Sequence, residues 1–363
     1  MFKRLLLLVC GTCLALGSLT AMARENGYNN DVDSARYQRD HREEHGRVLK
    51  VGLWGDQFYA DDPVVRAQMA QRTIRSMNAH HLDFTLYAGD TKNGHSLCTD
   101  TVIGQDVIQR FNSLNVPTLY TLGDNEWTDC HRTNNGSYDP LERLAYLRNL
   151  FFDKKTSQGP HPIRVQRQGH LGQAYSENSR FVRDRVEFVA LDVPGSNNNL
   201  VATAAECTHK SSRTQADCDA ATAEYRARNA ADMQWLKEAF DEARRRHYAG
   251  IAILIQADIF APFNLADGGY QDNFLPQLNA NNGYTDLFNT LVRETHDYDG
   301  QVLLIHGDSH YFRLDKAMYD PDGTLTRNFT RIEVFGNTDN SWVEMTVDPD
   351  SPDVFSFKPV ILQ

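Results

Sequence analysis

Five apolar segments of the 363-residue chain each end in a loop that offers an oxygen or nitrogen donor. The donor positions are Gly55-Asp56, Gly89-Asp90, Gly123-Asp124-Asn125-Glu126, Gln256 and Gly307-Asp308-Ser309-His310. In open α/β sheets, ligands gather outside the carboxyl ends of strands, so these loops are expected to converge. Carboxylates brought together raise one another's pKa unless a cation lies among them. The pattern predicts a site for one or two divalent metal ions, although each Gly-Asp alone is also a common turn.

The segments around these loops have the patterns of alternating strands and helices. Short apolar runs that end in glycine indicate buried strands, and apolar residues at helical spacing indicate the helices between them. A strand–helix alternation favours parallel pairing, and the end of the chain contains only strands. The expected elements are strands at 48–54, 83–89 and 116–123, helices at 63–79 and around 102–114, short strands over 163–192, a helix at 219–247, strands at 250–256 and 301–307, and strands from 311 onward.

The order and spacing of the donor loops resemble the calcineurin-like metallophosphoesterase superfamily. Its pattern is GDxH, then GD, then GNH followed by Asp or Glu, then a lone His after a strand, then GHxH. The chain reads GDQF at 55–58, GD at 89–90, GDNE at 123–126, Gln256 and GDSH at 307–310. The resemblance implies a four-layer α/β/β/α sandwich of two mixed β-sheets flanked by helices, a metallo-dependent phosphatase-like fold.

The resemblance also implies a role for each matching residue. Asn125 stands where the family usually has a histidine that contacts the phosphate and helps the leaving group depart. Glu126 takes the acidic position that orients that residue. The implied metal ligands are Asp56 and His310 for one ion, Asp124, Gln256 and Asp308 for the other, and Asp90 between them.

Several positions depart from the family pattern. Phe58 replaces a metal-binding histidine and cannot coordinate an ion. Other departures exchange one donor type for another: Asp124 for asparagine, and Asn125, Gln256 and Asp308 for histidine. The implied ligand set is rich in acids and keeps one histidine. Oxygen donors favour Mg²⁺, Mn²⁺ or Ca²⁺ over zinc or iron.

The reaction that the resemblance implies is hydrolysis of a phosphoester bond in a small molecule. Metals would clamp the phosphoryl oxygens and a metal-held hydroxide would attack in line. Lys92, His95, His131 and Arg132 are candidates for steadying phosphate charge, Arg132 through two hydrogen bonds, and the alternative for each is a solvated loop side chain. The alternative function is a non-catalytic metal- or ligand-binding member of the same fold, suggested by Phe58 and Asn125.

Residues 257–282 form a long segment between a donor loop and the next helix. Loops of such length are usually functional or disordered. Its aromatic residues are expected either to line a substrate pocket or to anchor the segment to the core. They are Phe260, Phe263, Tyr270 and Phe274.

The first 23 residues have the pattern of a secretory signal peptide. Lys3 and Arg4 precede an apolar run and a small-x-small motif that ends at Ala23. The run is shorter than the ~20 residues that span a bilayer, and a retained signal anchor is the alternative. We therefore expect export to the periplasm or the exterior, no stable membrane insertion, a polar leader over 24–46 and a single domain over 47–363.

Charge and cysteine content narrow the remaining possibilities. The formal net charge is −11, and loss of the signal peptide removes two positive charges, which argues against nucleic acid as a partner. An even number of cysteines after cleavage suggests disulfides in an exported chain. Three pairings are open, and Cys98–Cys130 with Cys207–Cys218 is favoured because the latter closes a short polar loop. The sequence indicates neither a particular substrate nor an oligomeric state.

Overall fold

The structure is a computed structural model that describes residues 46–260, 278–320 and 322–362. The described residues belong to one compact unit that begins at Gly46. The expected signal peptide, the leader up to residue 45, and Phe263, Tyr270 and Phe274 lie outside the described residues. The division into signal peptide, leader and single domain therefore stays a prediction.

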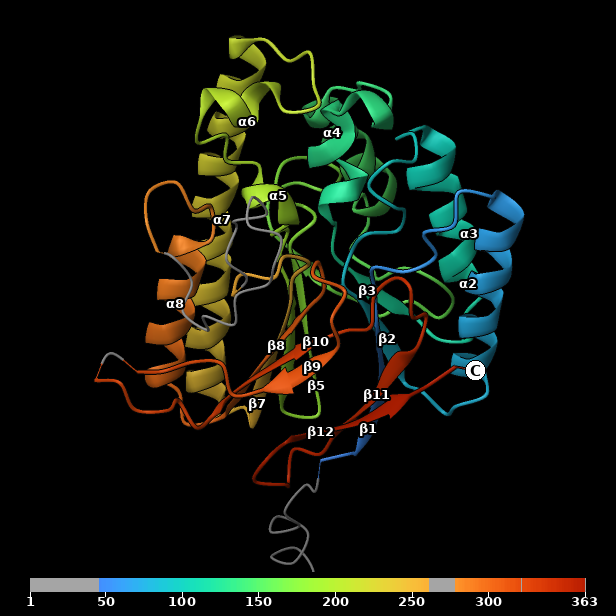
Figure 1. The fold of residues 1–363 in the computed structure, drawn as a ribbon. Coiled ribbons are helices and arrows are strands. Elements are labelled where there is room, and N and C mark those ends of the chain that lie inside the picture. Colours follow the sequence, from blue (N-terminus) through green and yellow to red (C-terminus); the bar gives the residue numbers. More distant parts are fainter. Residues whose placement is uncertain (1–45, 261–277, 321, 363) are drawn as a thin grey trace, which may run out of the picture. The chain divides into compact units, whose positions relative to one another are not determined.

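The first sheet has five strands in the order β12-β11-β1-β2-β3 (Figure 1). Strands β1, β2 and β3 pair in parallel, whereas β11 pairs antiparallel with β1 and with β12. Because β1, β2 and β3 run the same way, the donor loops that follow them leave the sheet at the same edge. The strands are β1 (Leu49–Trp54), β2 (Phe84–Tyr87), β3 (Thr118–Tyr120), β11 (Trp342–Val347) and β12 (Phe355–Val360).

The second sheet has seven strands in the order β4-β5-β6-β7-β8-β10-β9. Strands β6, β7, β8 and β10 are parallel, and the remaining three pair antiparallel at the two edges. The loops after β7 and β8 carry the fourth and fifth donor positions. The strands are β4 (Gln166–Arg167), β5 (Ser179–Arg183), β6 (Val186–Ala190), β7 (Gly250–Leu254), β8 (Gln301–His306), β9 (Arg313–Asp315) and β10 (Phe329–Glu333).

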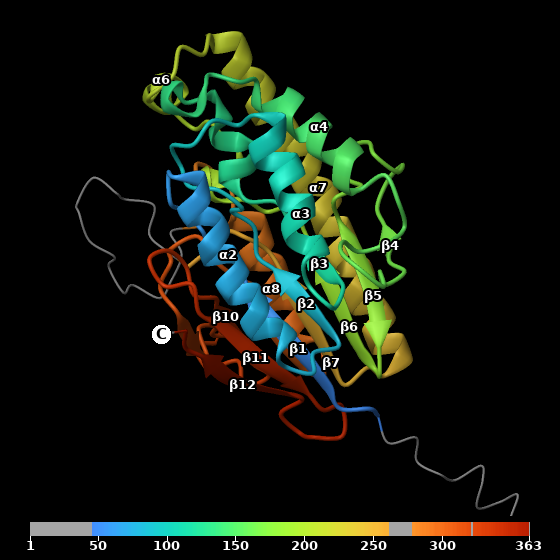
Figure 2. The ribbon, with the colours of Figure 1, turned by 90° about the vertical axis from the view of Figure 1, so that its right-hand side faces the viewer.

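Helices cover the outer face of each sheet, as the two views show (Figures 1 and 2). The first sheet carries α2 (Pro63–Asn78), α3 (Asp106–Asn112) and α4 (Pro140–Phe151), and the second carries α7 (Gln215–Arg246) and α8 (Thr285–His296). A third apolar cluster fills the space between the sheets, where Leu53 and Leu86 of one lie with Phe188, Leu254 and Ile305 of the other. The predicted four-layer sandwich of two mixed sheets flanked by helices is confirmed.

Helix α2 illustrates how local sequence signals set an element's bounds. Pro63 occupies the first helical turn, where a missing N–H costs nothing. The side chain of Asp62 accepts hydrogen bonds from the N–H groups of Val64 and Val65, at 2.7 and 3.2 Å. The helix buries Ile74 and Met77 against the sheet. Its bounds, Pro63–Asn78, are close to the predicted range of 63–79.

Two helical regions differ from the sequence-based expectation. The expected helix around 102–114 begins with a π-helical turn, η1, before α3. Helix α4 was not predicted, although Asp139 and Pro140 are good start signals. The short helical segments are η1 (Thr101–Gln105), η2 (Asp124–Glu126), η3 (Thr128–His131), η4 (Thr133–Asn135), α5 (Gly195–Asn198) and α6 (Ala204–Thr208).

The four cysteines outside the expected signal peptide form the favoured pairs, Cys98–Cys130 and Cys207–Cys218. The prediction of these two disulfides is confirmed. The first bond ties the segment before η1 to η3, beside the third donor loop. Among the described helices, none combines the length and the apolar character that a membrane span requires.

Candidate functional site

Main-chain hydrogen bonds hold the donor loops of both sheets together. The N–H of Asp56 donates to the carbonyl oxygen of Gly89 at 3.1 Å, which joins the loops after β1 and β2. The N–H of Asp308 donates to Oδ2 of Asp56 at 3.1 Å and so connects the two sheets. The N–H of Gly307 donates to the carbonyl oxygen of Gln256 at 2.9 Å. The structure thus brings the loops to one place at the carboxyl ends of parallel strands.

Four of the expected donor residues have left-handed backbone. Their φ angles are 50° at Asp56, 55° at Asp90, 77° at Asp308 and 61° at His310. Side-chain-bearing residues adopt such angles rarely, and those that do gather at ligand-binding sites, where the surroundings hold the strain. The sharp turn lets each chain reverse immediately after its strand.

Asp56, Asp90 and His310 form a compact group of metal-binding side chains. One ligand atom from each lies within 4.8 Å of the other two, and Nε2 of His310 is 3.7 Å from Oδ1 of Asp56. Both carboxylates are buried. Glycine makes room for them, because a Cβ on Gly307 would lie 1.7 Å from Asp56 Oδ2 and one on Gly123 would lie 2.1 Å from Asp90 Oδ1.

The electrostatics of this group fit a cation. Burial, followed by repulsion from Asp308, raises the pKa of Asp56 well above its usual value. Burial and then Asp124 do the same to the pKa of Asp90. Burial lowers the pKa of His310, which favours the neutral imidazole that binds metals. Two buried carboxylates and a neutral imidazole are a donor set that a divalent cation would neutralise.

Tyr59 belongs to the same group, and sequence reasoning missed it. Its hydroxyl donates to Asp90 Oδ2 at 3.0 Å and lies 3.5 Å from Asp56 Oδ1. Its ring meets the edge of the His310 ring, with centroids 5.1 Å apart. The only signal in the sequence was its position three residues after Asp56, in GDQFY.

Phe58, at the position where the resembled family has a histidine, packs into the core beneath the first sheet. It is fully buried, its ring centroid is 6.2 Å from that of Trp54, and the guanidinium of Arg110 lies 5.0 Å above it. The position that the family uses for an imidazole is therefore part of an apolar cluster here.

A second set of acids lies against Gly195, in the turn after β6. A Cβ at this glycine would lie 2.6 Å from Asp308 Oδ1 and 2.8 Å from Asp124 Oδ2. Gln256, expected as a ligand, accepts a hydrogen bond from the N–H of Gly195 through Oε1 at 2.5 Å, and its Nε2 is 3.3 Å from Asp308 Oδ1. One lone pair of the Gln256 oxygen is thus used by the backbone, and its role as a metal ligand stays a prediction.

Ser196 links the second acid set to Arg132. Its hydroxyl lies 2.7 Å from Asp124 Oδ2 and 2.8 Å from Asp129 Oδ1, and Nη2 of Arg132 donates to it at 3.2 Å. Arg132 also pairs with Asp129 directly. Burial and then Asp124 raise the pKa of Asp129 to about 7. Ser196 lies in the loop PGSNNN, which follows β6, a strand that pairs in parallel with β7. This position after a parallel strand was the signal from which the sequence could have indicated Ser196.

Asn125 and Glu126 hold the second and third donor loops together. Asn125 donates to Asp90 twice, through Nδ2 at 2.6 Å and through its main-chain N–H at 3.1 Å. Glu126 accepts from the N–H groups of Gly123 at 2.9 Å, of Asp90 at 3.2 Å and of Thr91. The acidic group thus orients two stretches of backbone, and Asp90 orients the Asn125 side chain.

Lys92 is buried and His131 is half-buried, and their roles at the site stay predictions. Lys92 is buried, its Nζ donates to the carbonyl oxygen of Asn93 at 3.0 Å, and burial lowers its pKa against the opposing field of Glu126. The charge of Lys92 therefore acts on neighbouring carboxylates within the protein, Glu126 first and then Asp90. Burial and then the charge of Arg213 lower the pKa of His131 to about 3, so this ring is neutral near pH 7.

A second acid and histidine group lies beside the first. Ligand atoms of Asp258, His306 and Glu333 lie within 4.8 Å of one another. Two arginines approach the same carboxylates: Arg313 Nε is 2.9 Å from Glu333 and Arg331 Nη1 is 3.9 Å from Asp258. Arg331 also binds Asp315, through Nε at 2.9 Å, so two arginines and three acids form an ion-pair network here.

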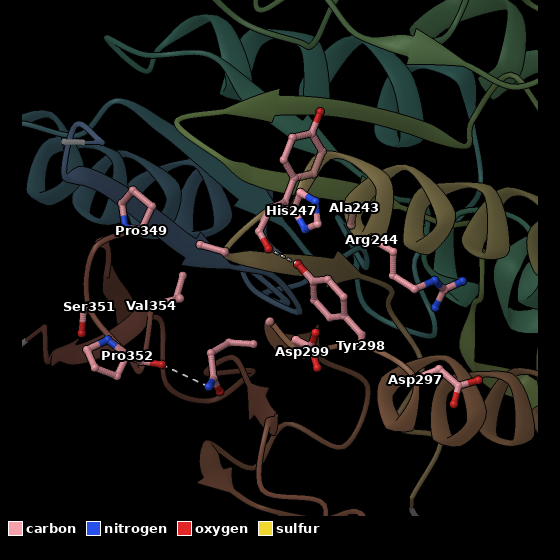
Figure 3. A pocket seen from close by; sticks show the side chains of 14 residues that line it. Ala243, Arg244, His247, Asp297, Tyr298, Asp299, Pro349, Ser351, Pro352 and Val354 are labelled. Atoms are coloured by element: carbon pink, nitrogen blue, oxygen red, sulfur yellow. Dashed lines mark hydrogen bonds between the residues drawn. The ribbon is translucent and has the colours of Figure 1, made fainter. Parts of the chain in front are cut away.

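A pocket of about 470 Å³ lies at the other end of the second sheet (Figure 3). It is lined by Ala249 and Gly300, which precede β7 and β8, and by Tyr298, Pro349 and Pro352. Because the donor loops follow the ends of these strands, this pocket is separate from the candidate metal site.

Comparisons with known proteins give only a general likeness. No protein-family model and no curated protein matches the sequence. Solved structures that resemble it include GAP50, the anchor in the inner membrane complex of Plasmodium (11% identity, 87% of this chain and 89% of that chain, TM-score 0.41). Another is 5'-nucleotidase from Candida albicans, with 13% identity over 87% of this chain and 52% of that chain and a TM-score of 0.41. A third is TT1561 of Thermus thermophilus, with 10% identity over 87% of this chain and 99% of that chain and a TM-score of 0.40. The chain spans about half of the 5'-nucleotidase, and similarity at this level carries no information on activity.

Proposed function

We propose that the protein is a metal-dependent hydrolase of phosphoester bonds and a divergent member of the calcineurin-like superfamily. The observation that carries this proposal is the meeting of Asp56, Asp90 and His310, whose ligand atoms lie within 4.8 Å of one another. They come from three loops that are far apart in the sequence, and the order of the donor loops is that of the superfamily.

We infer one divalent cation, held by Asp56, Asp90 and His310. An oxygen-rich set favours Mg²⁺, Mn²⁺ or Ca²⁺. When bound, the cation would supply polarisation of a phosphoryl oxygen and activation of a water molecule. A single ion is supported because, within the described part of the chain, Asp124 and Asp308 belong to no group of three His, Cys, Asp or Glu side chains whose ligand atoms meet.

Arg132 is the group that we propose to bind the phosphoryl oxygens. Asp129 and Ser196 hold its guanidinium next to Asp124, and about a quarter of its side chain is exposed. A guanidinium fixed in this way presents its remaining N–H groups in a defined plane, which suits two-point recognition of a phosphate.

The experiment is a metal-dependent assay of the full-length protein. The protein is stripped with a chelator, its metal content is measured by elemental analysis, and hydrolysis of phosphomonoesters and phosphodiesters is followed with added Mg²⁺, Mn²⁺, Ca²⁺ or Zn²⁺. We expect turnover that Asp90→Asn abolishes. Asp299→Asn is the matched control, because Asp299 is exposed in the pocket at the other end of the sheet. Absence of turnover with every metal contradicts the proposal.

A second candidate function is ion binding without hydrolysis. It is favoured by two residues: Phe58 lies in an apolar cluster and cannot coordinate an ion, and Asn125 has no titratable group with which to protonate a leaving group. Calorimetric titration separates the two functions. Tight binding of one ion together with no hydrolysis supports the binding role.

A further inference from the structure

Hydrolysis of an alkyl phosphoester is helped by a proton on the departing oxygen, and position 125 does not supply it. Asn125 has no titratable group. His131 lies beside Arg132 and Arg213 in a buried setting that keeps its ring neutral. His310 is a proposed metal ligand. The remaining sources of this proton are water and other protonated side chains near the site.

The turn formed by residues 93–96, here called the rim turn, lies next to the Tyr59 segment. Asn93 Nδ2 donates to the carbonyl oxygen of Tyr59 at 2.8 Å and to Oδ1 of Asp61 at 3.1 Å. Asn93 Oδ1 accepts from the N–H groups of His95 and Ser96, at 3.0 and 2.6 Å. One asparagine therefore fixes the rim turn and joins it to the loop that carries Tyr59.

The rim turn also lies over Asn125. A Cβ built on Gly94 would be 3.1 Å from Asn125 Oδ1, and Asn125 Nδ2 is bonded to Asp90. Glycine at 94 thus permits close approach of this backbone to the residue that stands at the family's acid position. His95 is the next residue along the chain.

His95 and Asp61 form a pair at the surface of this region. Nε2 of His95 is 2.8 Å from Oδ1 of Asp61, and the two side chains are 57% and 75% exposed. Among the described residues, no hydrogen bond involves Nδ1 of His95. A carboxylate on one ring nitrogen fixes the ring, and the other nitrogen is then available for proton transfer.

We propose that His95 is the general acid of the reaction and that Asp61 is the residue that positions its ring. The proposal rests on the proposed function. As water attacks, a P–O bond forms to the water oxygen and the P–O bond to the leaving group breaks. In the doubly protonated ring, Nε2–H stays on Asp61 and the proton on Nδ1 passes to the leaving oxygen. The attacking water releases its proton to the solvent, and the neutral ring takes one proton back from the solvent.

Leaving-group dependence tests the role. For His95→Gln, kcat on an alkyl phosphate should fall by about 10²–10⁴-fold. On 4-nitrophenyl phosphate, whose leaving group departs without protonation, it should change little. Asp61→Asn should show a smaller loss with the same preference. His161→Asn is the matched control, because His161 lies with Leu49 and Asp83 at the start of the strands, away from the donor loops.

Chemical rescue gives a second readout that a structural role would not produce. Added imidazole should restore hydrolysis of the alkyl phosphate by His95→Gly. An equal loss on both substrates in His95→Gln, or no rescue in His95→Gly, overturns the assignment and leaves the proposed function standing. No hydrolysis of either substrate by the unaltered protein overturns both.

Discussion

Replacement of Asp90 by asparagine should have opposite effects on stability with and without a metal ion. In the metal-free protein, burial and the neighbouring acids Asp124 and Asp56 raise the pKa of Asp90, so its charged form is costly. Asparagine removes that charge. With a metal bound, the same charge is an attractive partner for the cation, and its removal weakens binding.

The two effects have comparable sizes. Each unit by which burial raises a carboxyl pKa costs ~1.4 kcal/mol when the group is ionised. The substitution also replaces one of the acceptors that Asn125 and Tyr59 use, a loss of ~1 kcal/mol. The variant should therefore be as stable as the unaltered protein, or more stable, in a chelator. A metal at about 100 times its Kd stabilises the unaltered protein by ~2.7 kcal/mol, or about 4 °C in Tm for a unit of this length.

Calorimetric unfolding at pH 7.5, in a chelator and in a series of metal concentrations, measures both effects. We expect the unaltered protein to gain Tm with metal and Asp90→Asn to gain little. Asp232→Asn is the control. Asp232 lies in α7 and is also buried, but it accepts a hydrogen bond from Asn178 and pairs with Arg228 of the same helix. Its effect should not depend on the metal. If Asp90→Asn lowers Tm equally in chelator and in metal, the reasoning is refuted.

Three further predictions follow from other features. Gly307→Ala should lower metal affinity at least ~10-fold (~1.4 kcal/mol) in calorimetric titration, because its Cβ would lie 1.7 Å from Asp56 Oδ2; unchanged affinity contradicts this. Cys98→Ser with Cys130→Ser should lower the free energy of unfolding by ~3–4 kcal/mol in urea, since the bond spans 32 residues; a loss under ~1 kcal/mol would show that the bond hardly restricts the unfolded chain. Burial raises the pKa of Glu187 to about 8, above its unfolded value, so the native state holds a proton that the unfolded state releases. The stability from Glu187 is present at low pH and is lost as pH rises toward 8, by up to ~1.4 kcal/mol per pH unit. Glu187→Gln should flatten this slope of the free energy of unfolding, measured in urea between pH 5 and 8. An unchanged slope would contradict the raised pKa of Glu187.

The fold was predictable because its signals are local and repeated. Apolar runs that end in Gly-Asp indicated β1 and β2, and the same pattern at Gly307 indicated the end of β8. Parallel pairing then requires the loops to leave at one edge. Helix α4 carries equally clear start signals at Asp139 and Pro140, although it was not among the predicted elements.

The directions of the side chains were less predictable, because they depend on contacts between distant loops. The role of Gln256 as a metal ligand stays a prediction, and the sequence contains no sign that its oxygen accepts the N–H of Gly195, which is 61 residues away. Tyr59 and Ser196 take up places beside the acids through tertiary contacts alone. A motif specifies where a residue stands in the chain, and neighbours from other loops decide which way its polar atoms point.

The left-handed backbone at Asp56, Asp90, Asp308 and His310 limits which residue types these four positions accept. The Asp56 turn is held in part by the main-chain bond from its N–H to Gly89. The carboxylates of Asp56 and Asp90 also accept the N–H groups of Asp308 and Asn125, so these two side chains support the framework as well. Asparagine and glycine tolerate these angles, whereas β-branched residues resist them. A selection from randomised libraries at these positions should therefore recover small polar residues. Exchange of the donor at His310 should disturb the loop framework less than exchange of Asp56 or Asp90, whose carboxylates accept backbone N–H groups.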